Sequence, residues 1–310
     1  MQAWHLLLLP LTPLYACVVR ARAAAYRRGV LTAVRLPVPV VSVGNLTFGG
    51  TGKTPTVIAL VRDLVQRGRR PAVLTRGYGR RGTAPVVVLG PDPGLRPAAA
   101  GDEPLELAAR LPGVPILVDQ DRARGGYEAM RLGADTLVLD DGFQHLRLAR
   151  DLDLVVVDAG SPWGGGRLPP RGRLREPLSA VARASAVLVT KMSAEAEPQL
   201  AEVGATAHRV APGLPVFGSR LRVTRVHTPD GWRSGDDLAG RRVFVFAGVG
   251  RPQGFADLLG EHGAEVVATQ WFRDHHRYEA GEAAALVAAA TARDAVAVTT
   301  AKDAVKLPPG

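Results

Sequence analysis

Apolar residues in this chain fall into short runs that alternate with segments of helical spacing. A β-branched run over residues 40–43 stops at Gly44, and after a glycine-rich turn Val57, Leu60, Val61 and Leu64 recur at the three- and four-residue spacing of a helix. Further short apolar runs predict strands at 71–75, 86–89, 136–139, 153–158 and 186–191. Strand and helix therefore alternate, which predicts an α/β domain with a doubly wound, mostly parallel sheet.

The pattern changes after residue 213. Segments 215–223 and 226–232, the second with a Pro-Asp-Gly turn at 229–231, predict a two-stranded β linker. A second, smaller α/β domain then begins with an apolar strand at 243, and later strands are expected near 264–268 and 295–299. We therefore divide the chain into an N-terminal segment (1–36), a first domain (37–213), a linker (214–235) and a second domain (236–310).

Composition narrows the classes of partner. With 310 residues and 46% hydrophobic content the chain is long enough for two globular cores, and its single cysteine, Cys17, allows neither an internal disulfide framework nor a zinc cluster. A formal net charge of +10 favours anionic partners. Nucleic acid is not the expected partner, because the arginines are spread along the chain and aromatic residues make up only 5%.

The N-terminal segment is apolar over residues 4–19 but contains Pro10 and Pro13, and it is shorter than the roughly 20 residues that span a bilayer. Five arginines follow, at positions 20, 22, 27, 28 and 35. This order predicts an interfacial membrane anchor, with guanidinium groups meeting anionic headgroups. A secretory signal is disfavoured because no basic residue precedes the apolar run. An N-terminal helix buried against the first domain remains an alternative.

The turn after Gly44 predicts a phosphate-binding loop. It runs through Gly49, Gly50, Thr51 and Gly52 to Lys53 and Thr54, between a strand and a helix. Glycines let backbone N–H groups approach phosphate oxygens, the lysine reaches the β- and γ-phosphates, and the threonine hydroxyl is a ligand for Mg²⁺. The sequence departs from the usual pattern at its first position, where Thr47 replaces glycine, so a glycine-rich turn without a ligand is the alternative.

Paired carboxylates end the strand at 136–139. Asp140 is the expected Mg²⁺ ligand opposite the phosphate loop. Because neighbouring strand residues point to opposite faces, Asp141 is expected to be free for a structural or acceptor-side role. A phosphate loop followed by a strand with terminal acids is typical of nucleotide-hydrolysing and nucleotide-transferring enzymes.

Four further segments contain candidate functional residues, with weaker signals. The loop at 76–80 places Arg76 and Arg80 around a Gly-Tyr-Gly turn and suits an anion, although such loops are commonly solvated. Asp102 precedes a predicted apolar helix, and its position alone favours a role as the cap of that helix. The long loop at 160–177 holds four arginines beside Glu176, which suits a phosphate-bearing acceptor or a solvated linker. The two histidines after Asp274 lack the spacing of a metal site and favour proton handling, substrate contact or a surface position.

Six motifs occur in order: the phosphate loop, Arg-Gly-Tyr-Gly-Arg at 76–80, Gly-Asp-Glu-Pro at 101–104, Asp-Asp-Gly-Phe-Gln-His at 140–145, Gly-Arg-Leu-Arg-Glu-Pro at 172–177 and Asp-His-His at 274–276. Together they resemble the tetraacyldisaccharide 4′-kinase family of lipid A synthesis, from the N-terminal anchor to the last strand. The resemblance implies ATP- and Mg²⁺-dependent phosphoryl transfer to the 4′-hydroxyl of a tetraacyldisaccharide 1-phosphate at the cytoplasmic face of the bacterial inner membrane. It also implies two α/β domains joined by a two-stranded linker, with the active site in the cleft between them.

The resemblance further implies residue roles. Lys53 would cradle the phosphates, Thr54 and Asp140 would hold Mg²⁺, and Glu176 would join the metal shell. Asp102 would act as the acceptor-side base, oriented by His275, a role that His276 could share or replace. On the substrate side the matching motif residues are Arg76, Asp141, Gln144, His145, Arg171 and Arg175.

Other classes of protein remain possible from the sequence. A P-loop GTPase or ATPase of the metal-insertion or chaperone type shares the loop and the strand-end acids, but the guanine-reading Asn-Lys-x-Asp is absent and only Thr-Lys-Met-Ser stands at 190–193. A nucleic-acid-dependent ATPase and a non-catalytic membrane adaptor are weaker alternatives. No obligate protein partner is expected.

Overall fold

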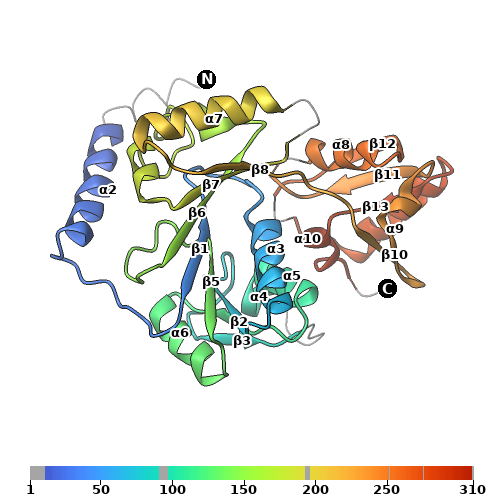
Figure 1. Cartoon of the computed structure of the whole chain (residues 1–310). Coiled ribbons are helices and arrows are strands. Elements are labelled where there is room, and N and C mark those ends of the chain that lie inside the picture. Colours follow the sequence, from blue (N-terminus) through green and yellow to red (C-terminus); the bar gives the residue numbers. More distant parts are fainter. Residues whose placement is uncertain (1–10, 91–96, 193–195, 251, 275, 309–310) are drawn as a thin grey trace. The chain divides into compact units, whose positions relative to one another are not determined.

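The computed structural model describes residues 11–90, 97–192, 196–250, 252–274 and 276–308. The chain divides into two compact units, residues 1–220 and 221–310, and each is described here by itself. Figure 1 shows the elements of both units in sequence colours.

The first unit is built on one sheet, which has eight strands among the described residues. Their order is β3-β4-β2-β5-β1-β6-β7-β8, and every pairing is parallel except that of β3 with β4. The strands are β1 (Val40–Gly44), β2 (Pro71–Thr75), β3 (Val86–Val88), β4 (Ile116–Val118), β5 (Thr136–Asp140), β6 (Leu152–Asp158), β7 (Ala186–Thr190) and β8 (Val216–Gly218).

Helices cover both faces of this sheet, which explains the continuous apolar runs of its central strands. All five residues of β2 and of β5 are buried. Alternate residues of β5 face different layers: Val138 packs with α3 (Lys53–Gln66) and α5 (Asp102–Arg110), while Leu137 and Leu139 pack with α6 (Arg122–Arg131). Helix α7 (Glu197–Val210) packs against β6 and β7. The predicted doubly wound α/β fold is confirmed.

The N-terminal helix α2 (Leu11–Arg27) lies at the surface of the first unit (Figure 1). Ala16 is buried, whereas the side chains of Leu14 and Val18, one helical turn apart, are 61% and 58% exposed. Among the described residues, no helix combines the length and apolar character needed to cross a bilayer. Residues 4–10 of the predicted anchor lie outside the described part of the chain. The short elements that complete this unit are α4 (Pro97–Ala100), η1 (Pro162–Gly165) and η2 (Leu178–Arg183).

The second unit holds a parallel three-stranded sheet in the order β12-β11-β13. Its central strand, β11, buries Val243 and Val245 against α8 (Gln253–Glu261) on one face and Phe244 and Phe246 against α9 (Ala280–Thr291) on the other. The predicted smaller α/β domain is thus present. Its elements are β11 (Arg242–Ala247), α8 (Gln253–Glu261), β12 (Glu265–Trp271), α9 (Ala280–Thr291), β13 (Val296–Val298), α10 (Ala301–Ala304) and the short η3 (Gly235–Leu238).

The predicted pairing of the linker strands is wrong in one half. Residues 216–218 form β8 and pair in parallel with β7 at the edge of the large sheet, so this apolar run extends the first core. The two-stranded sheet is instead a hairpin of β9 (Arg225–Thr228) and β10 (Gly231–Ser234), closed by Pro229 and Asp230. Gly231 adopts a φ of 114°, a conformation that glycine supplies without strain.

Candidate active site

Polar residues gather where the parallel strands end. The carboxyl ends of parallel neighbours lie at the same edge of a sheet, and ligands of open α/β sheets bind at that edge. In sheet order, β4, β2, β5, β1, β6 and β7 finish at or directly before Asp119, Arg76, Asp140, the phosphate loop, Asp158 and Lys191. Motifs scattered over more than 100 residues of sequence therefore converge on one edge of the first unit.

The predicted phosphate loop connects β1 to the start of α3. Gly52 precedes the helix with a φ of 86° and no side-chain cap, so a ligand can take the place of a cap on the first N–H groups of α3. Asn45 Nδ2 donates to Thr51 Oγ1 at 3.0 Å inside the loop, and Gln144 Nε2 donates to the Asn45 carbonyl oxygen at 2.9 Å. The loop is thus braced from within and from the end of β5.

Gly44 brings the loop into close contact with the segment after β5. A Cβ atom at this position would lie 2.6 Å from the Phe143 backbone nitrogen. We expect Gly44→Ala to destabilise the protein by about 1–3 kcal/mol, because the backbone has to move. Thermal unfolding measures this, and each kcal/mol corresponds to roughly 2–4 °C in a chain of this size.

Gly50→Ala is the matched control, because a Cβ at Gly50 meets no atom within 4 Å. An equal loss of melting temperature in both variants would contradict the close-packing explanation.

Lys53 faces a carboxylate that a second cation also holds. Its Nζ lies 3.6 Å from Asp141 Oδ1, and Arg175 Nη1 donates to Asp141 Oδ2 at 2.8 Å. Burial opposes ionisation of Asp141, but the two cations hold its pKa below the ordinary value. The strand ends at Asp140, and Asp141 adopts a φ of 55°, which turns its carboxylate toward Lys53.

Asp140 occupies a different environment one residue earlier. Its carboxylate is buried and receives a long hydrogen bond, 3.4 Å, from Thr75 Oγ1. Burial, reinforced by the negative charges of Glu103 and Asp141, raises the pKa of Asp140 to about 7, against the opposing charges of Lys53 and Arg122. A cation beside this carboxylate would restore its charge.

The donors present fit Mg²⁺ held jointly with a nucleotide. Asp140 offers a carboxylate and Thr54, the second residue of α3, offers a hydroxyl, both of which are ligand types for this ion. Within the described ranges, no group of three or more His, Cys, Asp or Glu side chains is placed to hold a metal. Phosphate oxygens and water would have to complete the coordination.

The arginine-rich loop at 160–177 closes directly onto the phosphate loop. Phe48 N donates to the Arg173 carbonyl oxygen, and Arg175 N donates to that of Leu46, each at 2.7 Å. The Arg175 guanidinium also lies 5.3 Å from the centre of the Phe48 ring. Arg175 therefore contacts both the phosphate loop and Asp141. Arg171, in the same arginine-rich loop, is exposed.

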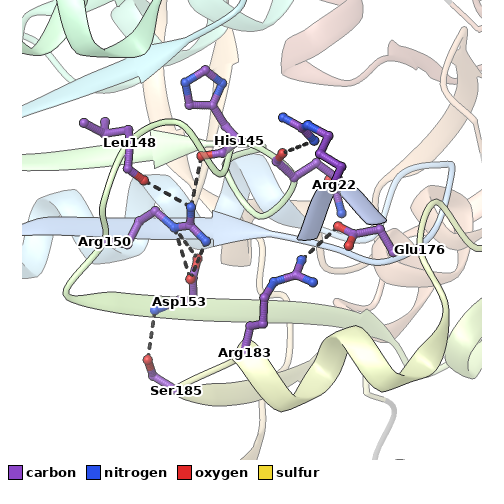
Figure 2. A network of polar contacts seen from close by, with 9 residues as sticks. Arg22, His145, Leu148, Arg150, Asp153, Glu176, Arg183 and Ser185 are labelled. Carbon is purple, nitrogen blue, oxygen red and sulfur yellow. Dashed lines mark hydrogen bonds and ion pairs between the residues drawn. The ribbon is translucent and has the colours of Figure 1, made fainter. Parts of the chain in front are cut away.

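Glu176, the third predicted metal ligand, is engaged elsewhere. Its Oε1 accepts a hydrogen bond from Arg183 Nη2 at 2.9 Å, and the carboxylate is buried (Figure 2). Arg183 in turn covers the Phe143 ring at 4.5 Å. This arrangement neutralises Glu176 without a metal, so its role as a ligand stays a prediction.

His145 lies in a polar network that fixes the segment between β5 and β6. Arg150 donates to the His145 carbonyl oxygen and forms a buried ion pair with Asp153 at 2.9 Å, while the ring of His145 points away from Arg150 (Figure 2). Burial, with the nearby charge of Arg122, lowers the pKa of His145 to about 4. Its imidazole is therefore neutral at physiological pH.

The Arg-Gly-Tyr-Gly-Arg and Gly-Asp-Glu-Pro motifs lie side by side. A Cβ at Gly77 would come within 2.7 Å of the Ala100 carbonyl oxygen, and one at Gly101 within 3.1 Å of that of Tyr78. Gly101 is the residue that precedes α5, and Asp102 is the first residue of the helix. The capping interpretation of Asp102 is therefore not supported, although its charge suits the helix N-terminus.

In the second unit, His275 lies outside the described residues. Its neighbour His276 is held by its own unit, because Nε2 lies 2.7 Å from Glu282 Oε2 and the ring stacks on Phe272 with centroids 4.5 Å apart. Lys302 pairs with Asp274 at 3.1 Å. The surroundings of His276 are those of a structural residue.

Sequence reasoning missed four residues at this edge. Glu103 and Arg122 surround Asp140 electrostatically, and Arg122 is 4% exposed with its Nη1 donating to the Asp119 carbonyl oxygen. Thr190 and Lys191 contact the phosphate loop itself. For Thr190 and Lys191 the available signal was their position at the end of the strand predicted at 186–191, since strand ends carry the site in this fold class. No strand was predicted directly before Glu103 or Arg122, so the sequence offered no comparable signal for them.

Comparison with known proteins assigns the chain to a family. The family model for tetraacyldisaccharide-1-P 4′-kinase (LpxK) matches residues 4–310. The chain belongs to this family. The resemblance inferred from the six sequence motifs is confirmed.

Individual relatives agree with the family model. The tetraacyldisaccharide 4′-kinase of Syntrophus aciditrophicus is 44% identical over 281 residues, covering 87% of this chain and 75% of that protein. The enzyme of the same name from Anaeromyxobacter dehalogenans (strain 2CP-1) is 48% identical over 270 residues, covering 86% and 71%. Among solved structures, the "apo" form of LpxK from Aquifex aeolicus in complex with ATP aligns with a TM-score of 0.75 and 32% identity over 98% of this chain and 90% of that one.

Proposed function

We propose that this chain is a tetraacyldisaccharide 4′-kinase, which transfers the γ-phosphoryl group of ATP to the 4′-hydroxyl of tetraacyldisaccharide 1-phosphate in lipid A biosynthesis. Membership of the LpxK family supports this reaction. The observation that carries it is Lys53 at the head of α3, poised beside Asp141 in a loop braced to receive phosphate. The GTPase alternative has no comparable support.

Phosphoryl transfer needs positioning and charge neutralisation more than covalent chemistry. The N–H groups of the phosphate loop and of the first turn of α3 would hold the β- and γ-phosphates. Lys53 would then exchange Asp141 for phosphate oxygens, and Asp141 would keep Arg175 as its partner. Mg²⁺, held by Thr54 and Asp140, would neutralise charge on the phosphates.

On the acceptor side, Asp102 is proposed to take the proton of the 4′-hydroxyl, with His275 orienting or tuning it. Arg76, next to the Asp102 motif, and the exposed Arg171 are proposed to contact the substrate. We also propose substrate contacts for Asp141, Gln144, His145 and Arg175. In the structure Asp141 pairs with Lys53 and Arg175, Gln144 donates to Asn45, and the His145 carbonyl oxygen accepts from Arg150. Glu176 is proposed to reach the metal after releasing Arg183.

Membrane association is proposed to run through α2. Its exposed Leu14 and Val18 supply apolar surface, and the arginines that follow favour anionic lipids. A lipid acceptor and ATP meet at the cytoplasmic face of the inner membrane, where we expect the protein to be peripheral or N-terminally anchored.

The test is the fate of the γ-phosphate. ATP labelled in that group is incubated with tetraacyldisaccharide 1-phosphate in detergent micelles, with water and a polynucleotide as competing acceptors. Label in the lipid that depends on Mg²⁺ is the expected result. Label in inorganic phosphate alone, with the lipid demonstrably accessible, would favour an NTPase.

The proposed base predicts a separation of turnover from nucleotide binding. Asp102→Asn and His275→Ala should each lower kcat by about 10²–10⁴-fold while the Kd for ATP stays within about twofold, because neither residue is expected to contact the phosphates. Steady-state kinetics and calorimetry measure the two quantities.

Asp230→Asn and His227→Ala in the β9–β10 hairpin are the matched controls and should leave both quantities unchanged. Wild-type turnover in Asp102→Asn or His275→Ala would remove that residue from the mechanism.

A further inference from the structure

The phosphate loop is held from the side of β7 as well as from within. Strands β6 and β7 are parallel neighbours in which Asp158 pairs with Thr190, so both strands end level beside the loop. Thr190 Oγ1 donates to the Thr51 carbonyl oxygen at 2.6 Å, and both side chains are buried. Lys191 Nζ donates to the carbonyl oxygen of Gly50.

These two carbonyl groups set the direction of the next two N–H groups. In a trans peptide unit the C=O of one residue and the N–H of the following residue point in opposite directions. A donor on the Gly50 oxygen therefore directs the Thr51 N–H away from β7, and a donor on the Thr51 oxygen does the same for the Gly52 N–H. A phosphate cradle requires several N–H groups that converge on one side of the loop.

Lys191 is held in place by its own contacts. Its Nζ forms an ion pair with Asp158 Oδ2 at 2.8 Å, and Gly160 N donates to the other carboxylate oxygen at 2.9 Å. Lys191 also adopts a φ of 56°, which is unfavourable for a side chain of this kind. The surrounding contacts sustain this conformation, which carries the side chain from the end of β7 to Gly50.

Gly52 of the phosphate loop also packs closely against Thr190. A Cβ atom there would stand 3.1 Å from Thr190 Oγ1, and the residue has a φ of 86°. Glycine at 52 thus permits both the turn into α3 and the approach of Thr190.

We propose that Thr190 and Lys191, the latter anchored by Asp158, are positioning residues that preorganise the phosphate loop for ATP. This inference rests on the proposed function, in that the loop is taken to bind ATP. It gives the Thr-Lys pair at 190–191 a role that does not involve reading a guanine base.

The test compares Lys191→Met and Thr190→Val, both close in shape to the native side chains, in the full-length protein. We expect the Kd for Mg²⁺–ATP by calorimetry and the KM for ATP to rise about tenfold in each variant, because each loses one hydrogen bond that orders the loop. The KM for the lipid acceptor should stay at the wild-type value. The melting temperature without nucleotide should fall somewhat in both variants, because Asp158 and the Thr51 carbonyl group are buried and each loses a partner.

Arg209→Met and Thr206→Val on α7 make the same changes of charge and hydroxyl away from the loop, and they should change neither ATP parameter. Wild-type ATP affinity in both loop variants would overturn the proposal. So would equal increases in the KM for ATP and the KM for the lipid, which would indicate a general disturbance of the first unit rather than a loss of order in the phosphate loop.

A failure of the proposed kinase function would give a different result from a failure of this proposal. If the wild-type protein binds ATP but transfers no phosphate to lipid, the kinase assignment fails, while the calorimetric comparison still decides the role of Thr190 and Lys191.

Discussion

Lys53→Ala is expected to lower phosphoryl transfer by about 10³-fold or more, because Lys53 is the one lysine or arginine within the phosphate loop at 44–54. The folded state should persist, since the Asp141 carboxylate left behind keeps its contact with Arg175. The pKa of Asp141 should rise when one of its two cations is lost. The measurement is the initial rate of label transfer from ATP to lipid.

Arg67→Ala is the matched control, because this residue follows the other end of α3, is exposed and pairs with Asp63 four residues earlier. It should transfer phosphate at the wild-type rate. Turnover within tenfold of wild type in Lys53→Ala would contradict the assigned role of the loop.

Asp140→Asn is expected to remove Mg²⁺-dependent turnover and to raise the melting temperature of the nucleotide-free protein above pH 7. Burial beside Glu103 and Asp141 raises the folded-state pKa of Asp140 from 3.8 to about 7. Between these values the folded state binds more protons than the unfolded state, so its stability falls as pH rises, and above about pH 7 the full cost is present. Asparagine cannot ionise and escapes this cost.

Melting temperatures measured between pH 5 and 8 without Mg²⁺ or ATP test the second half of this prediction. The wild-type curve should fall relative to that of Asp140→Asn as pH rises, and by pH 8 the variant should melt a few degrees higher. Asp63→Asn on exposed α3 surface should follow the wild type. A variant that melts lower than wild type at every pH would show that Asp140 stabilises the fold rather than serving the site.

Most strands of the first sheet were predictable because their information is local, although β4 (Ile116–Val118) was not predicted. Apolar runs at β1, β2, β5 and β6 are bounded by turn residues, and the phosphate loop is recognised by its order along the chain. The edge strand β8 was assigned to the wrong sheet, because a three-residue apolar run does not specify its partner. An apolar run of this length can pair with a linker strand or with the edge of the large sheet, and its packing against the first core determines which pairing forms.

The electrostatics of the site were less predictable. Alternation along a strand indicated that Asp140 and Asp141 would not both face the metal, but alternation ends with the strand, and the left-handed turn at Asp141 brings its carboxylate to Lys53. Arg122 and Lys191 lie in the site through parallel strand ends that are far apart in sequence. The residue types can be read from the sequence but their partners cannot, and the partners decide which charges are available to a ligand.

In the proposed reaction, the chain transfers phosphate from ATP to the 4′-hydroxyl of the lipid. The most direct measurement is mass spectrometry of the lipid after incubation with Mg²⁺–ATP, comparing tetraacyldisaccharide 1-phosphate with its 4′-deoxy analogue. The account predicts a mass increase of one HPO₃ unit in the first lipid only, and none with Lys53→Ala. An equal increase in the 4′-deoxy lipid, or no increase in either while ATP is hydrolysed, would contradict it.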